Sequence, residues 1–178
     1  MLMNSSILPS TSDLADSNPS LVRGFSSPFK SYGGRRAFHG RIETVQCFED
    51  AGAIRACLAE AGLGRVLVVD AGGSCRAAVL GDKMARLGVS NGWAGVIVNG
   101  AVRDCDTLSQ LEFGVLALGA VPVRGGLQGE GMRGANIVIA DIPFLAGTHV
   151  YVDADGILIA REALKDEATA DGSGCIPS

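Results

Sequence analysis

The sequence predicts a single α/β domain, in which helices flank a mixed β-sheet and hairpin strands close the C-terminal part. Two short apolar runs, at 65–70 and 95–99, are typical of buried parallel strands, and a segment with helical periodicity follows each. Three strand-like runs then succeed one another near the C-terminus, and Asp155-Gly156 provides a tight turn between the last two. This change from alternating to consecutive strands favours a mixed sheet.

The N-terminal quarter contains one short helix and one strand. Residues 11–17 predict the helix, which Ser12 or Asp13 can cap. Residues 23–40 are rich in Gly, Ser, Pro and Arg and predict a long loop. The alternating pattern at 42–47 predicts the strand.

A helix and a buried strand come next. Asp50 is the expected helix cap, and Gly62 occupies the position of a C-terminal cap. One face of this helix is apolar and carries Ile54, Cys57, Leu58 and Ala61. The strand at 65–70 is then broken by Ala71-Gly72-Gly73.

The second half repeats the alternation before the hairpins. We expect a helix at 81–91 with Asp82 at its start, a second helix at 103–110 and a strand at 115–120. Residues 122–135 hold five glycines and predict a mobile or ligand-facing loop. The C-terminal strands are expected at 136–144, 149–153 and 156–160.

Length and charge limit the possible functions. The 178 residues fit one domain spanning 1–178, with 1–10 and 162–178 as loose tails. The net charge is −4, and the one dense basic cluster, Arg35-Arg36 with Lys30 and Arg41 nearby, is better explained as a solvated loop, so we expect no direct nucleic-acid binding. The five cysteines form no CxxC pair, which disfavours a zinc site. No membrane span or secretory signal is recognisable, so we expect a cytoplasmic protein.

The glycine-rich loop also disfavours nucleotide-dependent chemistry. Gly129, Gly131 and Gly134 match GxGxxG, but the residues that follow predict a strand. A dinucleotide fingerprint requires a helix there, because the helix N-terminus binds the pyrophosphate. A phosphate loop also fails, since no Gly-Lys-Ser/Thr closes the segment.

Three strand ends are expected to meet at one edge of the sheet, where ligands of open α/β sheets bind. They are 70–73, 81–84 and 100–104. The N–H groups at the start of a helix, at 81–84, can bind a substrate carboxylate, although Asp82 can equally be a simple helix cap. Arg103 and Asp104 can aim a cation and a carboxylate into one pocket. On their own they are better explained by a surface ion pair or a cap.

The ordered segments together resemble one known family, which joins the regulator of ribonuclease activity A to the 4-hydroxy-4-methyl-2-oxoglutarate aldolases. The resemblance covers about residues 11–160. It is carried by TSDLADS (11–17), SYGGRR (31–36), CFED (47–50), VLVVDAGGS (66–74), GDKMA (81–85), NGWAGVIVNGAVRD (91–104) and YVDADG (151–156). An older label for such sequences, a methyltransferase of menaquinone synthesis, is disfavoured by the failed glycine motif.

The resemblance implies a metal-dependent lyase that forms a pyruvate enolate from 2-oxo acids, by aldol cleavage or by decarboxylation of oxaloacetate. It implies Asp104 as the ligand of Mg²⁺ or Mn²⁺ and Arg103 as the donor to the enolate oxygen. The substrate carboxylate would lie on the N–H groups of Asp82, Lys83 and Met84, after Gly81. Asp82 would hold a water that shuttles protons.

The same resemblance carries an alternative and an expectation about assembly. The family's regulators bind and inhibit a ribonuclease E-type endonuclease, and the well-known type lacks the Asp found here at 104. Homotrimers or hexamers are implied. Longer aldolases add a C-terminal Glu from a neighbouring subunit, for which Glu162 and Glu167 are candidates here.

Overall fold

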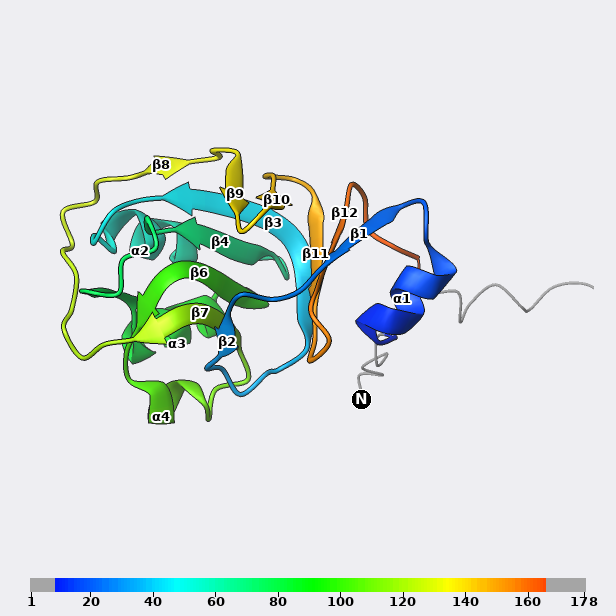
Figure 1. Ribbon diagram of the computed structural model, residues 1–178. Coiled ribbons are helices and arrows are strands. Elements are labelled where there is room, and N and C mark those ends of the chain that lie inside the picture. Colours follow the sequence, from blue (N-terminus) through cyan, green and yellow to red (C-terminus); the bar gives the residue numbers. More distant parts are fainter. Residues whose placement is uncertain (1–8, 166–178) are drawn as a thin grey trace, which may run out of the picture.

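The computed structural model describes residues 9–165. Four helices and twelve strands form within this range (Figure 1). They are α1 (Thr11–Ser17), β1 (Val22–Phe25), β2 (Lys30–Ser31), β3 (Phe38–Gln46), α2 (Gly52–Leu58), β4 (Val66–Asp70), β5 (Ala78–Leu80), α3 (Asp82–Ser90), β6 (Gly95–Val102), α4 (Cys105–Leu108), β7 (Gly114–Ala120), β8 (Met132–Arg133), β9 (Ile137–Ile139), β10 (Ile142–Phe144), β11 (His149–Val152) and β12 (Ile157–Ala160). Among the described helices none is long and apolar enough to cross a membrane.

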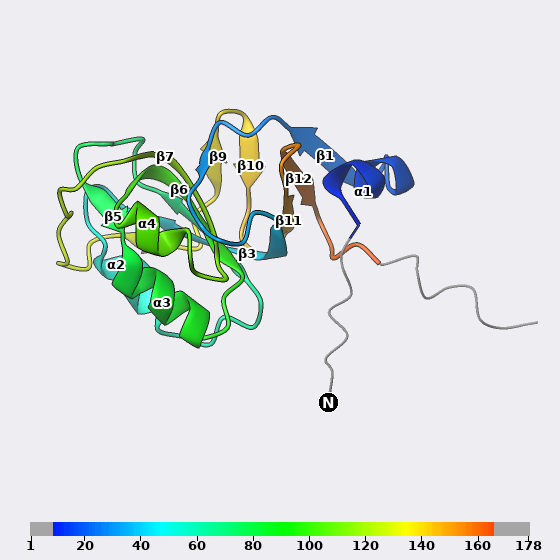
Figure 2. The ribbon, with the colours of Figure 1, turned by 90° about the horizontal axis from the view of Figure 1, so that it is seen from below.

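The predicted fold class is confirmed: an α/β domain with a mixed sheet and C-terminal hairpin strands. The main sheet has the order β1-β12-β11-β3-β4-β6-β7-β2. Its centre, β3-β4-β6-β7, is parallel, and the outer strands pair antiparallel. Helices α2 and α3 cover one face of the parallel centre, whereas the β9–β10 hairpin lies on the opposite side (Figure 2).

Alternation along the central strands produces two apolar cores. In β4, Leu67 and Val69 face the helices, and Val66 and Val68 pack in the second core with β9, β10 and β11. All four are fully buried. A strand buried on both faces has no polar alternation, which is why the apolar run at 65–70 predicts it correctly.

The N-terminal expectations need two corrections. Ser10, rather than Ser12 or Asp13, caps α1, because its Oγ accepts the backbone N–H of Asp13 at 3.1 Å. The long loop expected at 23–40 is wrong, since it contains most of β1, all of β2 and the start of β3. These strands were not predicted because β1 and β2 are only four and two residues long and largely exposed.

Two later elements also differ. The strand expected at 136–144 is the β9–β10 hairpin, whose turn places Ala140 and Asp141 at positive φ without a glycine to signal it. The helix expected at 103–110 is a single turn, Cys105–Leu108, and it starts late because Asp104 before it adopts a left-handed conformation. Of the expected tails, 1–8 and 166–178 lie outside the described residues.

Candidate functional site

Three strand ends converge at the candidate site. Because β6 extends three residues past its last pair with β4, the edge beyond it is taken by β5. Leu80 of β5 and Ala120 of β7 both pair with Val102, the last residue of β6. Gly81, Arg103 and Val121, which follow these three residues, therefore emerge side by side.

The β4 end, 70–73, was expected to join this group and forms a separate cluster instead. Asn99 Nδ2 donates to Asp70 Oδ1 at 2.8 Å, and Gln46 Nε2 lies 3.4 Å from Asp70 Oδ2. The cause is the register: Asp70 pairs with Asn99, three residues before β6 ends. The third strand end at the site is therefore that of β7 rather than that of β4.

Asp104 lies at the centre of the site in a left-handed conformation, with φ 61° and ψ 40°. Such a conformation is uncommon for a residue other than glycine and is often found at functional positions. Asp104 is the N-cap residue of α4, yet its side chain makes no cap hydrogen bond. Its Oδ2 instead accepts the backbone N–H of Asp82 at 3.1 Å and lies 3.6 Å from Arg103 Nε. Asp104 therefore does not cap its own helix, α4, whereas the ion pair with Arg103, the other alternative, is present.

Gly81 makes this approach possible. It is the N-cap residue of α3 in extended conformation and has no side chain to cap the helix, so Asp82 is not the N-cap residue. The first N–H of α3 donates to Asp104 Oδ2 instead. A Cβ added at Gly81 would lie 2.6 Å from Asp104 Oδ2 and 3.2 Å from Arg103 Cγ. Glycine is therefore required here by space and not by backbone conformation.

A hollow of about 250 Å³ lies beside the ion pair. Its lining residues are Arg103, Asp104, Cys105, Ala120, Val121 and Pro122. The side chains of Arg103 and Asp104 are each 35% exposed, so both charges reach solvent and the hollow at once. Arg103 Nη1 also lies 3.5 Å from the carbonyl oxygen of Pro122, which limits the directions the guanidinium can take.

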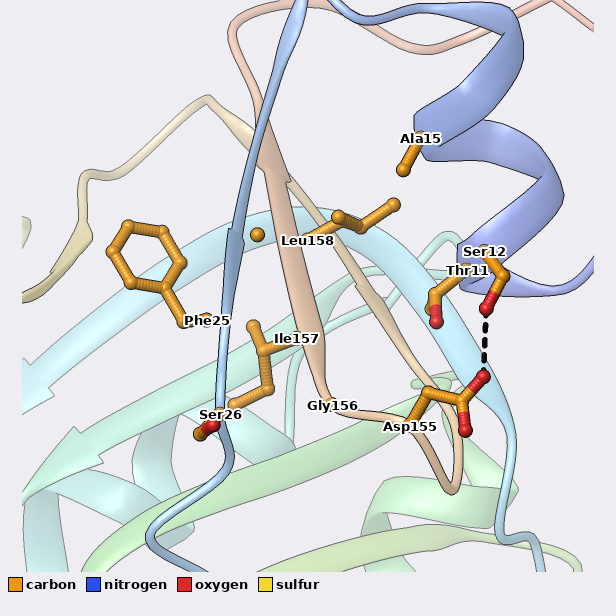
Figure 3. Close-up of a pocket in the computed structure, with 10 residues that line it drawn as sticks. Thr11, Ser12, Ala15, Phe25, Ser26, Asp155, Gly156, Ile157 and Leu158 are labelled. Atoms are coloured by element: carbon orange, nitrogen blue, oxygen red, sulfur yellow. Dashed lines mark hydrogen bonds between the residues drawn. The ribbon is translucent and has the colours of Figure 1, made fainter.

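A second hollow, of about 280 Å³, lies between α1 and the β1–β12 pair (Figure 3). Asp155 is the ionisable residue in its lining, and its Oδ2 accepts the hydroxyl of Ser12 at 2.7 Å. The remaining lining residues are small, polar or apolar. This hollow lacks the paired charges found at Arg103 and Asp104, so the smaller one is the candidate site.

A family model described as RraA-like, Aldolase/RraA, matches residues 11–159. The chain belongs to the Aldolase/RraA family. Among its relatives is a protein of Alkalilimnicola ehrlichii named "Putative 4-hydroxy-4-methyl-2-oxoglutarate aldolase", 47% identical over 86% of this chain and 96% of that protein. A protein of Aromatoleum aromaticum with the same name is 45% identical over 86% of this chain and 97% of that protein.

Solved structures of the Aldolase/RraA family share the fold. The RNA-processing inhibitor RraA of Thermus thermophilus has a TM-score of 0.85 and 39% identity, over 91% of this chain and 98% of that one. A protein of Geobacillus kaustophilus, titled an S-adenosylmethionine:2-dimethylmenaquinone methyltransferase, has a TM-score of 0.84 and 39% identity, over 88% and 97%. The family therefore includes proteins named for quite different activities.

The sequence predicted the polar residues of this candidate site but not the apolar ones. Gly81, Asp82, Arg103 and Asp104 are brought together in the structure, and Lys83 and Met84 stand in the same first turn of α3. Ala120, Val121 and Pro122 were missed, because only the β6–β7 register places them there. Cys105 could have been inferred from its position next to Asp104.

Within the described residues, no three His, Cys, Asp or Glu side chains group as a metal site. The donor set here is the single carboxylate of Asp104, with its neighbour Asp82 partly buried. Mg²⁺ is often held by one or two carboxylates and otherwise by water. One accessible carboxylate at the mouth of a hollow fits a hydrated Mg²⁺ or Mn²⁺ better than it fits Zn²⁺, which needs several protein ligands.

Proposed function

We propose that this chain is a lyase of 2-oxo acids that forms the enolate of pyruvate, with 4-hydroxy-4-methyl-2-oxoglutarate as a substrate of its aldolase reaction. One observation carries the proposal. The guanidinium of Arg103 and the carboxylate of Asp104 line one hollow beside the first turn of α3. Relatives at 45–47% identity that are named as aldolases support the choice of reaction.

The binding step uses the start of α3. Helix geometry leaves the first-turn N–H groups without intrahelical acceptors, and the helix dipole favours an anion there. The N–H of Asp82 already donates a hydrogen bond to Asp104 Oδ2. The carboxylate of the substrate would therefore lie on the N–H groups of Lys83 and Met84, with its keto oxygen toward Arg103.

The chemical step breaks the bond between C3 and C4 of the substrate. Its electron pair forms the C2–C3 double bond of the enolate, the 4-hydroxyl loses its proton and becomes a ketone, and C3 is later protonated. Arg103 donates hydrogen bonds to the developing enolate oxygen, where a charged planar donor is most effective. Asp82 would hold the water that receives and returns the proton.

A divalent cation completes the proposal. Asp104 would hold Mg²⁺ or Mn²⁺, and a bound cation supplies Lewis-acid stabilisation of negative charge on the substrate oxygens. Oxaloacetate would undergo decarboxylation in the same hollow, because loss of carbon dioxide leaves the same enolate.

Regulation of a ribonuclease E-type endonuclease is the second candidate function. The TM-score of 0.85 to the RNA-processing inhibitor of Thermus thermophilus supports it. Binding a partner protein needs no convergence of Arg103, Asp104 and the α3 start, whereas lyase chemistry uses all three. The lyase is therefore the better-supported function.

The proposal is tested by measuring pyruvate release from 4-hydroxy-4-methyl-2-oxoglutarate and from oxaloacetate. We expect turnover of both, abolished by a chelator and restored by Mg²⁺ or Mn²⁺. Full turnover by protein shown to be metal-free would exclude the metal role. Failure to release pyruvate from either acid would remove the lyase proposal and leave the regulator.

A further inference from the structure

One wall of the hollow continues into a segment that is hydrogen-bonded along its length, residues 123–129, which we call the strap. It begins directly after Val121 and Pro122. The carbonyl of Val123 accepts the N–H of Ala78 at 2.7 Å, and the N–H of Gly125 donates to the carbonyl of Ala78 at 2.9 Å. The strap therefore leaves the site alongside β5, in the segment where the glycines predict a mobile or ligand-facing loop.

The strap then crosses the segment between β3 and α2. The N–H of Gly126 donates to the carbonyl of Glu49 at 2.8 Å, and the carbonyl of Gly126 accepts the N–H of Ala51 at 2.8 Å. A Cβ at Gly125 would lie 2.7 Å from the Glu49 carbonyl oxygen. Glycine is required at 125 because the two backbones are in such close contact.

The carboxylate of Asp50 binds the far end of the strap. It is 6% exposed, and its Oδ2 accepts the N–H of Gln128 at 2.7 Å. Its Oδ1 accepts the N–H groups of Gly129 at 3.0 Å and of Gly52 at 2.9 Å. The sequence predicted only a helix-capping role for Asp50. Two of the three N–H groups that its carboxylate accepts belong to residues 78 and 79 positions away in the chain.

These hydrogen bonds keep the buried carboxylate charged. Burial raises the pKa of Asp50, but the three backbone N–H donors outweigh it and bring the pKa below the ordinary value. Hydrogen bonds to a charged, buried acceptor are among the strongest in proteins. The strap is therefore held by an anion that stays ionised at neutral pH.

The geometry points to Asp50 as a positioning residue for the Arg103–Asp104 site. By binding the strap it fixes the Val121–Pro122 wall, and with it the carbonyl of Pro122 that faces Arg103 Nη1. The consequence for turnover rests on the proposed lyase function. The consequence for the wall itself does not, and the two can be measured separately.

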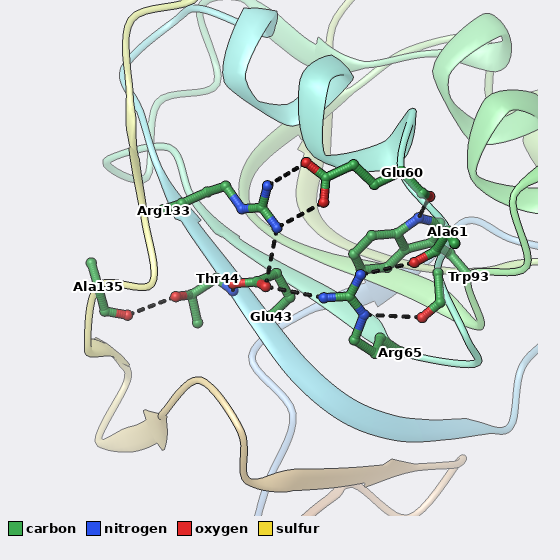
Figure 4. Close-up of polar contacts among 9 residues, drawn as sticks. Glu43, Thr44, Glu60, Ala61, Arg65, Trp93, Arg133 and Ala135 are labelled. Atoms are coloured by element: carbon green, nitrogen blue, oxygen red, sulfur yellow. Dashed lines mark hydrogen bonds and ion pairs between the residues drawn. The ribbon is translucent and has the colours of Figure 1, made fainter.

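A second attachment, at Arg133, provides a matched control. Arg133 follows the strap in β8 and forms ion pairs with Glu60 at 2.7 Å and with Glu43 at 3.3 Å (Figure 4). Glu60 contributes one carboxylate to this attachment, as Asp50 does to the other. Arg133 is eleven positions from Pro122, so loss of the Glu60 contact should loosen the Arg133 side chain without moving the wall.

The experiment compares Asp50→Asn with Glu60→Gln. Cys105 lines the hollow with Val121 and Pro122, so its alkylation rate, followed by peptide mass spectrometry, reports on the wall without requiring turnover. In Asp50→Asn we expect Cys105 alkylation and amide exchange at 121–129 to rise at least about tenfold, because opening the strap no longer breaks charged hydrogen bonds. In Glu60→Gln both should match the parent.

Activity and folding separate the remaining outcomes. In Asp50→Asn we expect a lower kcat at similar KM, because Arg103 acts on the transition state. If Asp50→Asn does not fold, Gly126→Ala replaces it, since its Cβ would lie 2.8 Å from Asp50 Oδ2 and displace the strap.

Unchanged Cys105 alkylation in the folded variant would overturn the inference. If the parent is active and the kcat of Asp50→Asn equals that of the parent, Asp50 only stabilises the strap and does not position the site. An inactive parent would count against the proposed function, and the Cys105 comparison would still decide the strap.

Discussion

Asp104 Oδ2 accepts the backbone N–H of Asp82 at 3.1 Å, so one carboxylate joins the start of α3 to the turn after β6. The two segments are 22 positions apart in the chain and meet because β5 and β6 are paired. The hydrogen bond uses Oδ2, which leaves Oδ1 as the oxygen that can face a cation. Any change that widens this junction should affect the site before it affects the fold.

Gly81→Ala tests the junction directly. The new Cβ would lie 2.6 Å from Asp104 Oδ2, so the carboxylate must move. We expect kcat to fall about a hundredfold, the usual effect of a displacement near 1 Å at a reacting centre. Loss of the glycine N-cap should cost about 1 kcal/mol, which lowers Tm by roughly 2–4 °C in a chain of this length.

Gly24→Ala is the matched control for this substitution. Gly24 lies in β1, away from the site, and its added Cβ would meet only the flexible tip of Leu158 at 3.3 Å. Steady-state kinetics and thermal melts of both variants check the prediction. Equal rates in Gly81→Ala and the parent would show that the close approach of Gly81 and Asp104 has no catalytic role.

The polar half of the site could be predicted because its signals are local. A glycine that opens a helix, and an Arg-Asp pair that leaves a buried strand, are both readable within five residues. The walls at Ala120–Pro122 could not be predicted, because they depend on the β6–β7 register. The role of Asp50 was missed for the same reason, since its partners lie in a distant glycine-rich segment.

The same difference between local signals and distant contacts explains which parts of the fold could be predicted. Buried strands and the helix at 82–90 were located because burial on both faces, or on one helical face, leaves a pattern. Strand β5 was missed because three apolar residues fit any element. The β9–β10 turn was missed because Ala140 adopts a positive φ that its residue type disfavours.

His149 should make stability dependent on pH. Burial, and then the charge of Arg41, lower the pKa of this imidazole below its ordinary value, and its Nδ1 is buried without a hydrogen-bond partner among the described residues. A depressed pKa means that the neutral form is favoured by folding. Its contribution is therefore complete above about pH 6.5 and is lost as the pH falls through the folded value.

We therefore expect the Tm of the parent to fall between pH 7.5 and pH 5, and to fall less steeply in His149→Gln. Glutamine retains polarity at this position but does not titrate. Thermal melts at half-unit pH intervals measure both slopes. Parallel slopes in the two proteins would assign the acid sensitivity to other groups.

Assembly is a separate prediction, carried by the family resemblance. We expect a homotrimer or hexamer, which light scattering at micromolar concentration measures. Large apolar side chains remain exposed on the described part of the chain, among them Leu63 at 86%, Val138 at 64% and Met132 at 61%. Exposed apolar side chains mark a contact between copies only where they form one continuous patch. A monomer under these conditions would contradict the expectation.

Asp104→Asn should remove the cation while leaving the fold intact. Asparagine is nearly isosteric, tolerates the left-handed conformation of this residue, and can still accept the N–H of Asp82. Removing a residue that only hydrogen-bonds to a metal ligand typically lowers metal affinity about 10- to 100-fold. Removing Asp104, the proposed ligand itself, should lower Mn²⁺ affinity at least as much. Mn²⁺ titration, followed by electron paramagnetic resonance, measures the effect. Unchanged Mn²⁺ affinity would place the metal elsewhere or exclude it.

Arg103→Lys separates the lyase from a protein-binding module. Lysine keeps the charge but loses the planar fork, and its single ammonium cannot reproduce the direction set by Pro122 and Asp104. Loss of one well-placed oxyanion donor typically lowers kcat by about a hundredfold to a thousandfold. The Arg103 side chain is 35% exposed and adds little to the core, so Tm should stay within about 2 °C of the parent. The decisive data are the decarboxylation rate, Mn²⁺ affinity and Tm of this variant beside those of Asp104→Asn. Parent-like rates in both variants, with both folded, would remove the site and favour the ribonuclease-regulating function, for which these side chains matter only where a partner touches them.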